Sequence, residues 1–219
     1  MLGVGTPYHE EKKYKTNTLK LHGSDDVDRA LRVKLKLELP RANLSIATGD
    51  GYSIVAEAEG FGSPGSRLED RFKPTYDAER RELGLSLRQS KSGFFATVEQ
   101  PMTVTMPLGR FVDADVILES GLLVLDLSDA DFATSDFGAG AFWDLDLGRV
   151  DLTLLVPKDL DLKIELGDGV EAEAQNEAGL DWDGAKKRWK RGENPDVKVR
   201  VKRFEGGDFI IRETPAQAE

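Results

Sequence analysis

The chain has 219 residues, of which 39% are hydrophobic, and its 40 Asp and Glu outnumber its 30 Lys and Arg. This length supports one large β domain or two small domains. No stretch approaches the roughly 18 apolar residues of a transmembrane helix. The absence of cysteine excludes disulfides, thiolate metal sites and cysteine nucleophiles.

The charge is unevenly distributed along the chain. Residues 113–183 contain 19 acids and three bases, a net charge of −16, and the rest of the chain carries +6. We interpret the acidic region as the solvated outer face of a β structure. The alternative is a surface that binds cations or a basic partner.

The N-terminal part predicts an arm followed by strands. Residues 1–32 are polar and predict an extended arm with a short capping helix from about Ser24 to Leu31. Residues 33–39 alternate apolar and polar side chains, which is typical of a half-buried strand. Two further alternating runs flank Asp50-Gly51, which favours a hairpin or a corner.

The segment 60–82 has the least regular pattern. It contains several Gly and Pro residues and then a highly charged run, so we expect an irregular insertion there. Alternating runs at 83–87, 94–98, 102–106 and 112–118 predict that strands resume after it.

The strongest pattern lies at 121–169. Apolar residues alternate with polar ones in successive short runs that recur about every 18–20 residues and are separated by Gly, Pro or Asp-Gly. Such spacing predicts stacked β coils. The corners of the coils need residues that tolerate a positive φ, and Gly121 stands at about the right place for one. We therefore expect an all-β, right-handed, single-stranded β-solenoid over 33–213, and a β-sandwich is the alternative.

The C-terminal part predicts a cap and two closing strands. Residues 176–193 combine two Trp with a basic run and are expected to cover the open end of the stack. Alternating residues predict strands at 196–204 and 209–212, and 214–219 is expected to be a disordered tail.

The sequence resembles the toast-rack group of bacterial envelope proteins, which includes the C-terminal domain of cell-wall-active antibiotic response regulators and related adhesin-like β-solenoids. The resembling segments are LELPRANLSIATGDGYSIVAEAEG at 37–60, LVLDLSDADF at 123–132, FWDLDLGRVDLTLLVPKDLDLKIELGDGV at 142–170 and NPDVKVRVKRFEGGDFIIRE at 194–213. The resemblance implies a right-handed solenoid without a known active site. It also implies a place at the cell envelope, although residues 1–5 are too short for the hydrophobic part of a signal peptide.

The sequence gives little evidence of a catalytic or metal-binding motif. The two histidines, His9 and His22, lie in the N-terminal arm, far from the acidic region in sequence, so a Ser-His-Asp triad or a His-rich metal site is not expected. The Asp-rich turns lack the spacing of known calcium loops. We therefore expect no enzyme activity, no cofactor and no bound metal.

Two sets of residues are candidates for an interaction surface. The first is basic and aromatic: Trp182, Lys186, Lys187, Arg188, Trp189, Lys190 and Arg191. The second is an acidic face formed by Asp126, Asp144, Asp146 and Asp161.

The function expected from these features is a non-catalytic interaction or scaffold module of the bacterial cell envelope or the envelope stress response, with a protein partner or a second copy of the chain. One alternative is a carbohydrate-binding or carbohydrate-cleaving solenoid that uses paired carboxylates of the acidic face. Another is a binder of anionic membrane surfaces or cell-wall polymer through the basic segment. Nucleic acid is not expected, because the sequence pI is about 4.9.

Overall fold

The computed structural model describes residues 6–15, 30, 32–49, 52–62, 67–92, 95–106, 108, 111–128 and 140–214. Within these ranges the chain is all-β and no residue is helical. The expected capping helix falls outside the described residues except for the buried Ala30. Most of the expected tail is outside them too.

The described residues form sixteen strands. Their bounds are β1 (Thr6–Lys15), β2 (Arg32–Leu39), β3 (Ala42–Thr48), β4 (Ser53–Gly62), β5 (Arg67–Asp77), β6 (Glu82–Ser92), β7 (Phe95–Glu99), β8 (Pro101–Met106), β9 (Phe111–Asp126), β10 (Ala141–Val156), β11 (Leu162–Leu166), β12 (Gln175–Asn176), β13 (Asp181–Asp183), β14 (Arg188–Arg191), β15 (Val197–Gly206) and β16 (Phe209–Glu213).

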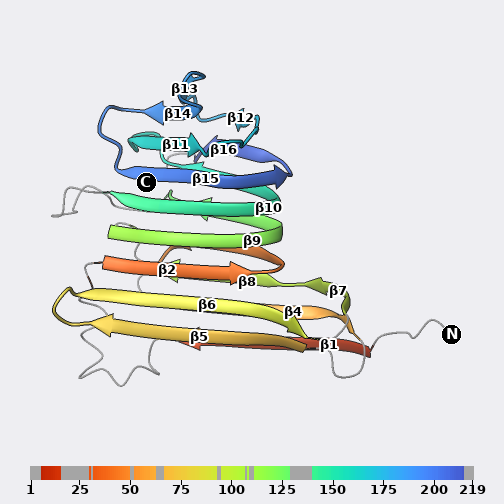
Figure 1. Ribbon diagram of the computed structural model, residues 1–219. Coiled ribbons are helices and arrows are strands. Elements are labelled where there is room, and N and C mark those ends of the chain that lie inside the picture. The colour runs from red at the N-terminus through yellow and green to blue at the C-terminus, as the bar shows by residue number, and fades with distance from the viewer. Residues whose placement is uncertain are drawn as a thin grey trace.

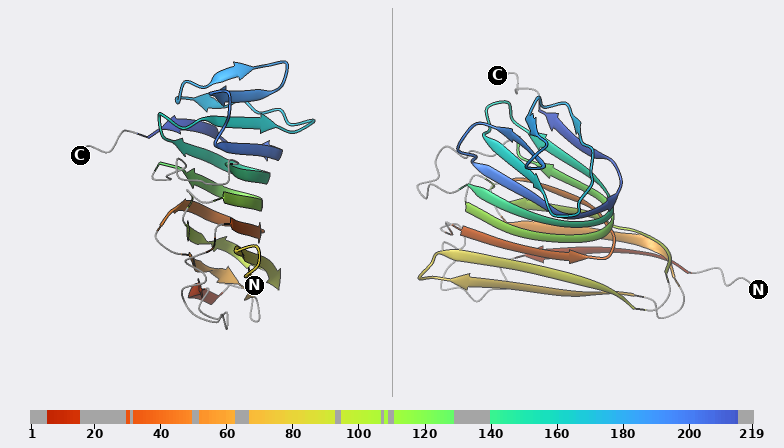
Figure 2. Two further views of the ribbon diagram at one scale, coloured as in Figure 1. Left: turned by 90° about the vertical axis from the view of Figure 1, so that its left-hand side faces the viewer. Right: turned by 45° about the horizontal axis from the view of Figure 1, so that its top comes forward.

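These strands belong to one mixed sheet that does not close on itself and that bends into two walls (Figure 1, Figure 2). The front wall contains β5, β6, β2, the first halves of β9 and β10, β15, β11, β14 and β13. The rear wall contains β1, β4, β8, β3, the second halves of β9 and β10, β16 and β12. Neighbouring strands in the middle of both walls are parallel, as in stacked coils.

The chain passes from the front wall to the rear wall at corners that stack on one another. Within β9 the corner is Gly121, which has a φ of 124°. A Cβ atom at this position would lie 2.0 Å from the carbonyl oxygen of Ala42 in the neighbouring corner. Gly121 also pairs with Val150 at the corner of β10. The structure therefore confirms the expected corner role of this glycine, since only glycine adopts this backbone without strain.

The coils do not stack in sequence order. In Figure 1, β2 (orange) lies between β6 (yellow) and β9 (green), and β15 (blue) lies between β10 and β11 (teal to cyan). A simple solenoid would place consecutive coils beside each other. Here one coil near each end of the chain is inserted between two others, which the periodic pattern did not reveal. The handedness of the stack stays a prediction.

The expected repeat of 18–20 residues is wrong. Val116 pairs with Leu145 in the next coil, and Leu123 pairs with Leu152. The runs around Leu145 and Leu152 belong to one strand, β10, on the two sides of its corner. Alternation alone cannot distinguish a corner within a coil from a turn between coils.

Two local expectations are also corrected. The segment 60–82 is not an irregular insertion, because β4 extends to Gly62 and β5 pairs antiparallel with β6. Its alternation was hidden because β5 places half-buried Phe72 and Tyr76 between charged residues. The runs around Asp50-Gly51 do not form a hairpin, since β8 lies between β3 and β4 and pairs with both.

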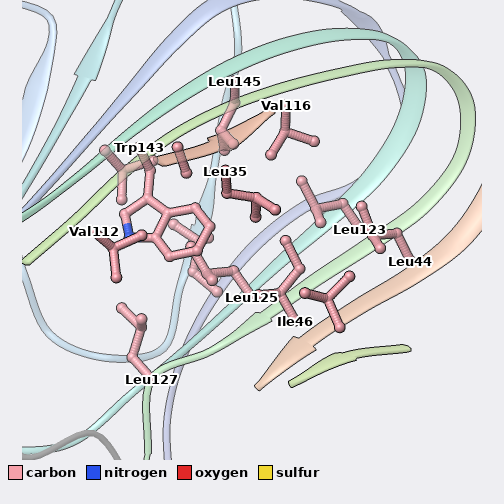
Figure 3. Packing of buried hydrophobic residues seen from close by; sticks show 14 of the residues in the cluster. Leu35, Leu44, Ile46, Val112, Val116, Leu123, Leu125, Leu127, Trp143 and Leu145 are labelled. Carbon is pink, nitrogen blue, oxygen red and sulfur yellow. The ribbon is translucent and has the colours of Figure 1, made fainter. Parts of the chain in front are cut away.

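The core lies between the two walls. Figure 3 shows side chains of both walls pointing toward one another across it. The labelled residues, each at most 1% exposed, are Leu35, Val112, Val116, Trp143 and Leu145 from the front wall and Leu44, Ile46, Leu123, Leu125 and Leu127 from the rear wall or its end. Inward residues such as Val116 and Leu145, or Leu123 and Leu152, face each other in neighbouring coils, so the hydrophobic surface of one coil is buried by its neighbours.

Candidate interaction surface

The acidic residues of β10 are paired with bases of β15. The Arg200 guanidinium donates two hydrogen bonds of 2.7 Å to the Asp144 carboxylate. The Lys202 ammonium lies 2.6 Å from the same carboxylate and 3.7 Å from Asp115. Burial alone would raise the pKa of Asp144, but the hydrogen bonds from Arg200 and Lys202 outweigh it and hold this pKa below its usual value.

A third base on β15 joins three further acids. Arg203 contacts Asp146 and donates hydrogen bonds of 2.9 and 3.2 Å to Glu119 and one of 3.0 Å to Glu205. The hydrogen bonds to Glu119 and Asp146 raise the pKa of Arg203. An arginine guanidinium is charged in proteins in any case, and these contacts favour its charged form further.

Outward side chains on the front wall form one charged row in register across seven strands. In spatial order the row is Lys36, Asp115, Asp144, Arg200, Glu165, Arg188 and Asp183. Opposite charges directly across a ladder attract each other. The like-charged neighbours Asp115 and Asp144 are both contacted by Lys202. The negative charge of residues 113–183 is thus partly balanced within the front wall, largely because β15, which carries bases, is inserted into it. The sequence could not show this.

The four acids expected on one face do not form one cluster. Asp126 ends β9 on the rear wall, where its carboxylate accepts a hydrogen bond of 3.0 Å from the backbone N–H of Ser128. Asp161 lies before β11, and its backbone oxygen accepts hydrogen bonds from the N–H groups of Asp196 and Val197. Only Asp144 and Asp146 lie together, and both are paired with arginine.

Arg191, expected as a contact residue, is used within the fold. Its guanidinium donates hydrogen bonds to the backbone oxygens of Pro157 at 2.8 Å, Lys158 at 2.5 Å and Ala178 at 2.6 Å. It also lies 3.5 Å from the Glu213 carboxylate at the end of β16. One side chain of β14 therefore ties together three segments that are distant in sequence.

The other residues of the basic run are divided between internal contacts and solvent. Arg188 pairs with Asp183 at 3.3 Å, and the Lys187 ammonium donates a 3.4 Å hydrogen bond to the backbone oxygen of Val170. Lys186 is exposed in the turn between β13 and β14, and Lys190 is half-buried.

An aromatic column closes the end of the core beside β13. Trp182 packs on Trp189 with ring centroids 4.2 Å apart, and Trp189 meets Phe209 edge to face at 5.5 Å. Trp189 is 5% exposed, whereas Trp182 is 48% exposed and is the large hydrophobic side chain that the described residues present most openly to solvent. The hairpin β13–β14 lies at this end of the stack and carries Trp182 on its exposed side. Its role as a cap over residues 176–193 stays a prediction.

The charged row borders an open depression of about 540 Å³. Its lining residues are Glu165, Leu166, Gly167, Asp168, Lys186, Arg200 and Lys202. Arg200 and Lys202 are already paired with Asp144. This arrangement supplies neither a nucleophile with an adjacent base nor a buried acid, which acyl transfer or glycoside hydrolysis would need.

The rear wall carries an uncharged row that sequence reasoning missed. Seven outward side chains lie in register across neighbouring strands: Val55, Thr103, Ser45, Val124, Thr153, Ile210 and Gln175. All are exposed or half-buried. One feature of the sequence could have indicated this row. In the unbroken apolar run 122–125, both the inward and the outward positions are apolar.

Across the described residues, no group of three or more His, Cys, Asp or Glu side chains is arranged to hold a metal ion. The Asp-rich turn at 128–131 lies mostly outside them. No helix long and apolar enough to cross a membrane occurs in the described part of the chain.

Comparison with known proteins gives fold similarity only. No family model and no curated protein matches the sequence. A solved structure from Clostridium sporogenes, a "putative cell adhesion protein", covers 95% of this chain and 100% of its own, with 14% identity and a TM-score of 0.56. A "putative adhesin" from Parabacteroides distasonis covers 70% of this chain and 55% of its own, with 10% identity and a TM-score of 0.19. The first of these shares the overall fold.

Proposed function

We propose that this protein is a non-catalytic interaction module whose main contact surface is the uncharged row of the rear wall. The observation that carries the proposal is the contrast between the two walls. The front wall neutralises its own charges with pairs such as Asp144 and Arg200, whereas the rear wall exposes aliphatic and hydroxyl groups in register. The centres of protein interfaces are depleted in charged residues.

A role of this module in adhesion is supported by the similarity of its fold to a solved structure. The Clostridium sporogenes protein with the same overall fold is named for cell adhesion. Together with the resemblance to toast-rack proteins, this favours a role at the bacterial envelope, where the partner is a protein or a second copy of the chain.

The two alternatives have less support. Carbohydrate cleavage would need two available carboxylates, but Asp144 and Asp146 are occupied by arginines. Binding of anionic membranes or cell-wall polymer would use Lys186, Lys190 and the exposed Trp182, because Arg188 and Arg191 are engaged in internal contacts. This end of the stack is the second candidate surface.

The proposal is tested by retention of the purified chain on envelope fractions of the organism that encodes it. The variant Val124→Glu/Thr153→Glu places two charges in the centre of the uncharged row. We expect it to fold, since both positions are outward, and to lose retention because two carboxylates would have to be buried in the interface without partners.

The matched control is Lys34→Gln/Lys36→Gln, which changes the net charge by the same amount on the front wall. This control should be retained as well as the native chain. Equal retention of the Val124→Glu/Thr153→Glu variant would contradict the proposed surface. Loss of retention in Lys186→Glu/Lys190→Glu instead would assign the contact to the basic end.

A further inference from the structure

The front wall ends in a free strand edge on each side of the stack. Among the described strands, β5 pairs only with β6, and β13 pairs only with β14. Figure 1 shows β5 and β13 at opposite ends of the stack. A free edge presents unpaired backbone N–H and C=O groups, which can pair with a strand of another chain. The front wall therefore offers two places at which the sheet can be continued.

The side chains at these two edges are complementary. β13 consists of Asp181-Trp182-Asp183, in which Trp182 lies on the core side against Trp189, is 48% exposed, and is flanked by the two acids on the outward side. Residues 71–73 of β5 are Arg71-Phe72-Lys73, in which both bases are exposed and Phe72 is half-buried against the core. One edge thus reads acid, aromatic, acid, and the other reads base, aromatic, base.

The strand directions allow the two edges to meet. β13 runs parallel to β6, because the two antiparallel steps from β13 to β14 and from β14 to β11 cancel, and every later step to β6 is parallel. β5 is antiparallel to β6. A second copy that is shifted along the stack without being turned therefore brings its β5 beside β13 as an antiparallel neighbour, with the inward and outward faces of the two strands matched.

One register matches every residue of β13 with a complementary residue of the second copy. The facing pairs are Asp181–Lys73, Trp182–Phe72 and Asp183–Arg71. Opposite charges and aromatic pairs directly across an antiparallel ladder are each favourable, and the exposed indole is removed from water. A shift by one residue would set outward side chains against inward ones. The contact also ends before Pro74 of β5, which has no N–H to donate to a new neighbour.

The existing partner of Asp183 does not prevent this contact. The Asp183 carboxylate pairs with Arg188 of the same chain at 3.3 Å and is 31% exposed. On the same wall, Asp144 contacts two bases at once, since Arg200 and Lys202 both reach its carboxylate. The carboxylate of Asp183 can likewise accept a second base from outside.

Neither three-residue segment suits a copy of itself. Antiparallel pairing of Arg71-Phe72-Lys73 with its own copy would place base opposite base, and pairing of Asp181-Trp182-Asp183 with its own copy would place acid opposite acid. Like charges directly opposite each other are destabilising. The charges therefore disfavour contacts between identical edges and favour the contact between different edges, which is how partner choice is made specific.

We infer that copies of this protein associate head to tail, with β13 of one copy against β5 of the next. A contact between two different surfaces is heterologous, and it builds an open chain when it does not close into a ring. Because few residues take part on each side, the association is weak and increases with concentration. This inference goes beyond the proposed function, since it uses the ends of the front wall and not the uncharged row of the rear wall.

The first test reverses the charges of one edge at a time. The variant Arg71→Glu/Lys73→Glu is acidic at both edges, and Asp181→Lys/Asp183→Lys is basic at both. Each alone should associate at least about tenfold more weakly than the native chain, because like charges then face each other. An equimolar mixture should regain association, because the acidic β5 of the first variant meets the basic β13 of the second.

Light scattering over a concentration series measures this association. The mean molar mass of the native chain should rise steadily with concentration and pass that of a dimer. The matched control is Arg149→Glu/Lys198→Glu, which reverses two exposed bases in the middle strands β10 and β15 and should behave as the native chain. A native chain that stays monomeric, or whose mass levels off at that of a dimer, would overturn the inference.

The exposed tryptophan locates the contact. Association should cover Trp182, so iodide quenching of its fluorescence should fall as the concentration of the native chain rises. The variant Arg71→Glu/Lys73→Glu, which leaves β13 unchanged, should show no such fall. Protection of Trp182 to the same extent in this variant would place the contact elsewhere and overturn the assignment to β5.

A cross-linking experiment keeps the inference testable if the charge-reversed chains do not fold. The native chain has no cysteine, so Lys73→Cys and Asp181→Cys each carry one thiol. In a mixture of the two, a short bismaleimide should link the different variants faster than it links identical ones. The control mixture replaces Lys73→Cys with Lys198→Cys, which lies in the middle of the front wall. Equal rates of cross-linking in the two mixtures would overturn the inference.

Discussion

The Arg200 guanidinium and the Asp144 carboxylate share two hydrogen bonds of 2.7 Å, and this pair joins β15 to β10. The two residues face each other directly in parallel strands. Their contact exists only because β15 is inserted between β10 and β11. A measurement of this contact therefore also tests the order of the coils, which the sequence does not reveal.

This pair should contribute measurably to stability. A double-mutant cycle with Asp144→Ala and Arg200→Ala, followed by urea denaturation, should give a coupling free energy of about 1 kcal/mol, since the pair is bidentate but Arg200 is 45% exposed and screened by solvent. The Glu177–Arg212 pair, with both side chains about half exposed, serves as the control and should couple more weakly. Equal coupling in the two cycles would contradict this prediction.

Acid should remove the contribution of Asp144. Its folded pKa lies below the ordinary value of 3.8, so the folded state binds fewer protons than the unfolded state near this pH. The contribution is complete above the unfolded pKa and is lost as pH falls through the lowered folded pKa. The stability difference between the native chain and Asp144→Asn should therefore shrink below about pH 4. A difference that grows with acidity would contradict the assignment.

Gly121 should be intolerant of any side chain. Gly121→Ala combines a positive φ with a Cβ atom 2.0 Å from the Ala42 carbonyl oxygen. We expect a loss of about 3 kcal/mol or more of unfolding free energy. Gly169→Ala is the matched control, because its φ is 79° but nothing lies within 4 Å of the added Cβ. It should cost about 1 kcal/mol, and equal losses would indicate that the corners are not closely stacked.

The three tryptophans should differ in accessibility. Trp143 and Trp189 are buried, whereas Trp182 is 48% exposed. Iodide should therefore quench mainly the fluorescence of Trp182, and Trp182→Phe should remove most of the quenchable signal. In thermal or urea unfolding, Trp189→Ala should cost about 3–5 kcal/mol because it leaves a cavity in the aromatic column, and Trp182→Ala should cost less.

Arg191 should protect β15 and β16 from local opening. Arg191→Lys keeps the charge but cannot reproduce the hydrogen bonds to three backbone oxygens, so we expect a loss of about 2 kcal/mol. Hydrogen exchange should accelerate in β15 and β16 more than in β2 and β9. Lys190→Arg serves as a control for a change on the same strand and should leave exchange unaltered.

Local structure followed closely from the sequence where the alternation was clean. The run 33–39 became β2 almost residue for residue, because its inward and outward positions differ sharply in hydrophobicity. The strand β5 was missed since its inward positions are aromatic residues among charges. Of the basic and aromatic residues, Trp182 and Lys186 are solvent-accessible, whereas Arg191 and Trp189 serve the fold. Their use as an interaction surface stays a prediction. A basic run looks the same whether its side chains meet water or backbone carbonyls.

The sequence by itself determined that the protein is all-β, which side chains along most strands face the core, and that glycine stands at the corner of β9. These properties depend on contacts within a strand or turn, where periodicity and backbone freedom act locally. The tertiary structure decided the order of the coils, the pairing of Asp144 with Arg200, and the separation into a charged front wall and an uncharged row on the rear wall. Each depends on which distant strands become neighbours. Many strands here offer similar aliphatic inward faces, so the alternating pattern does not distinguish one partner from another.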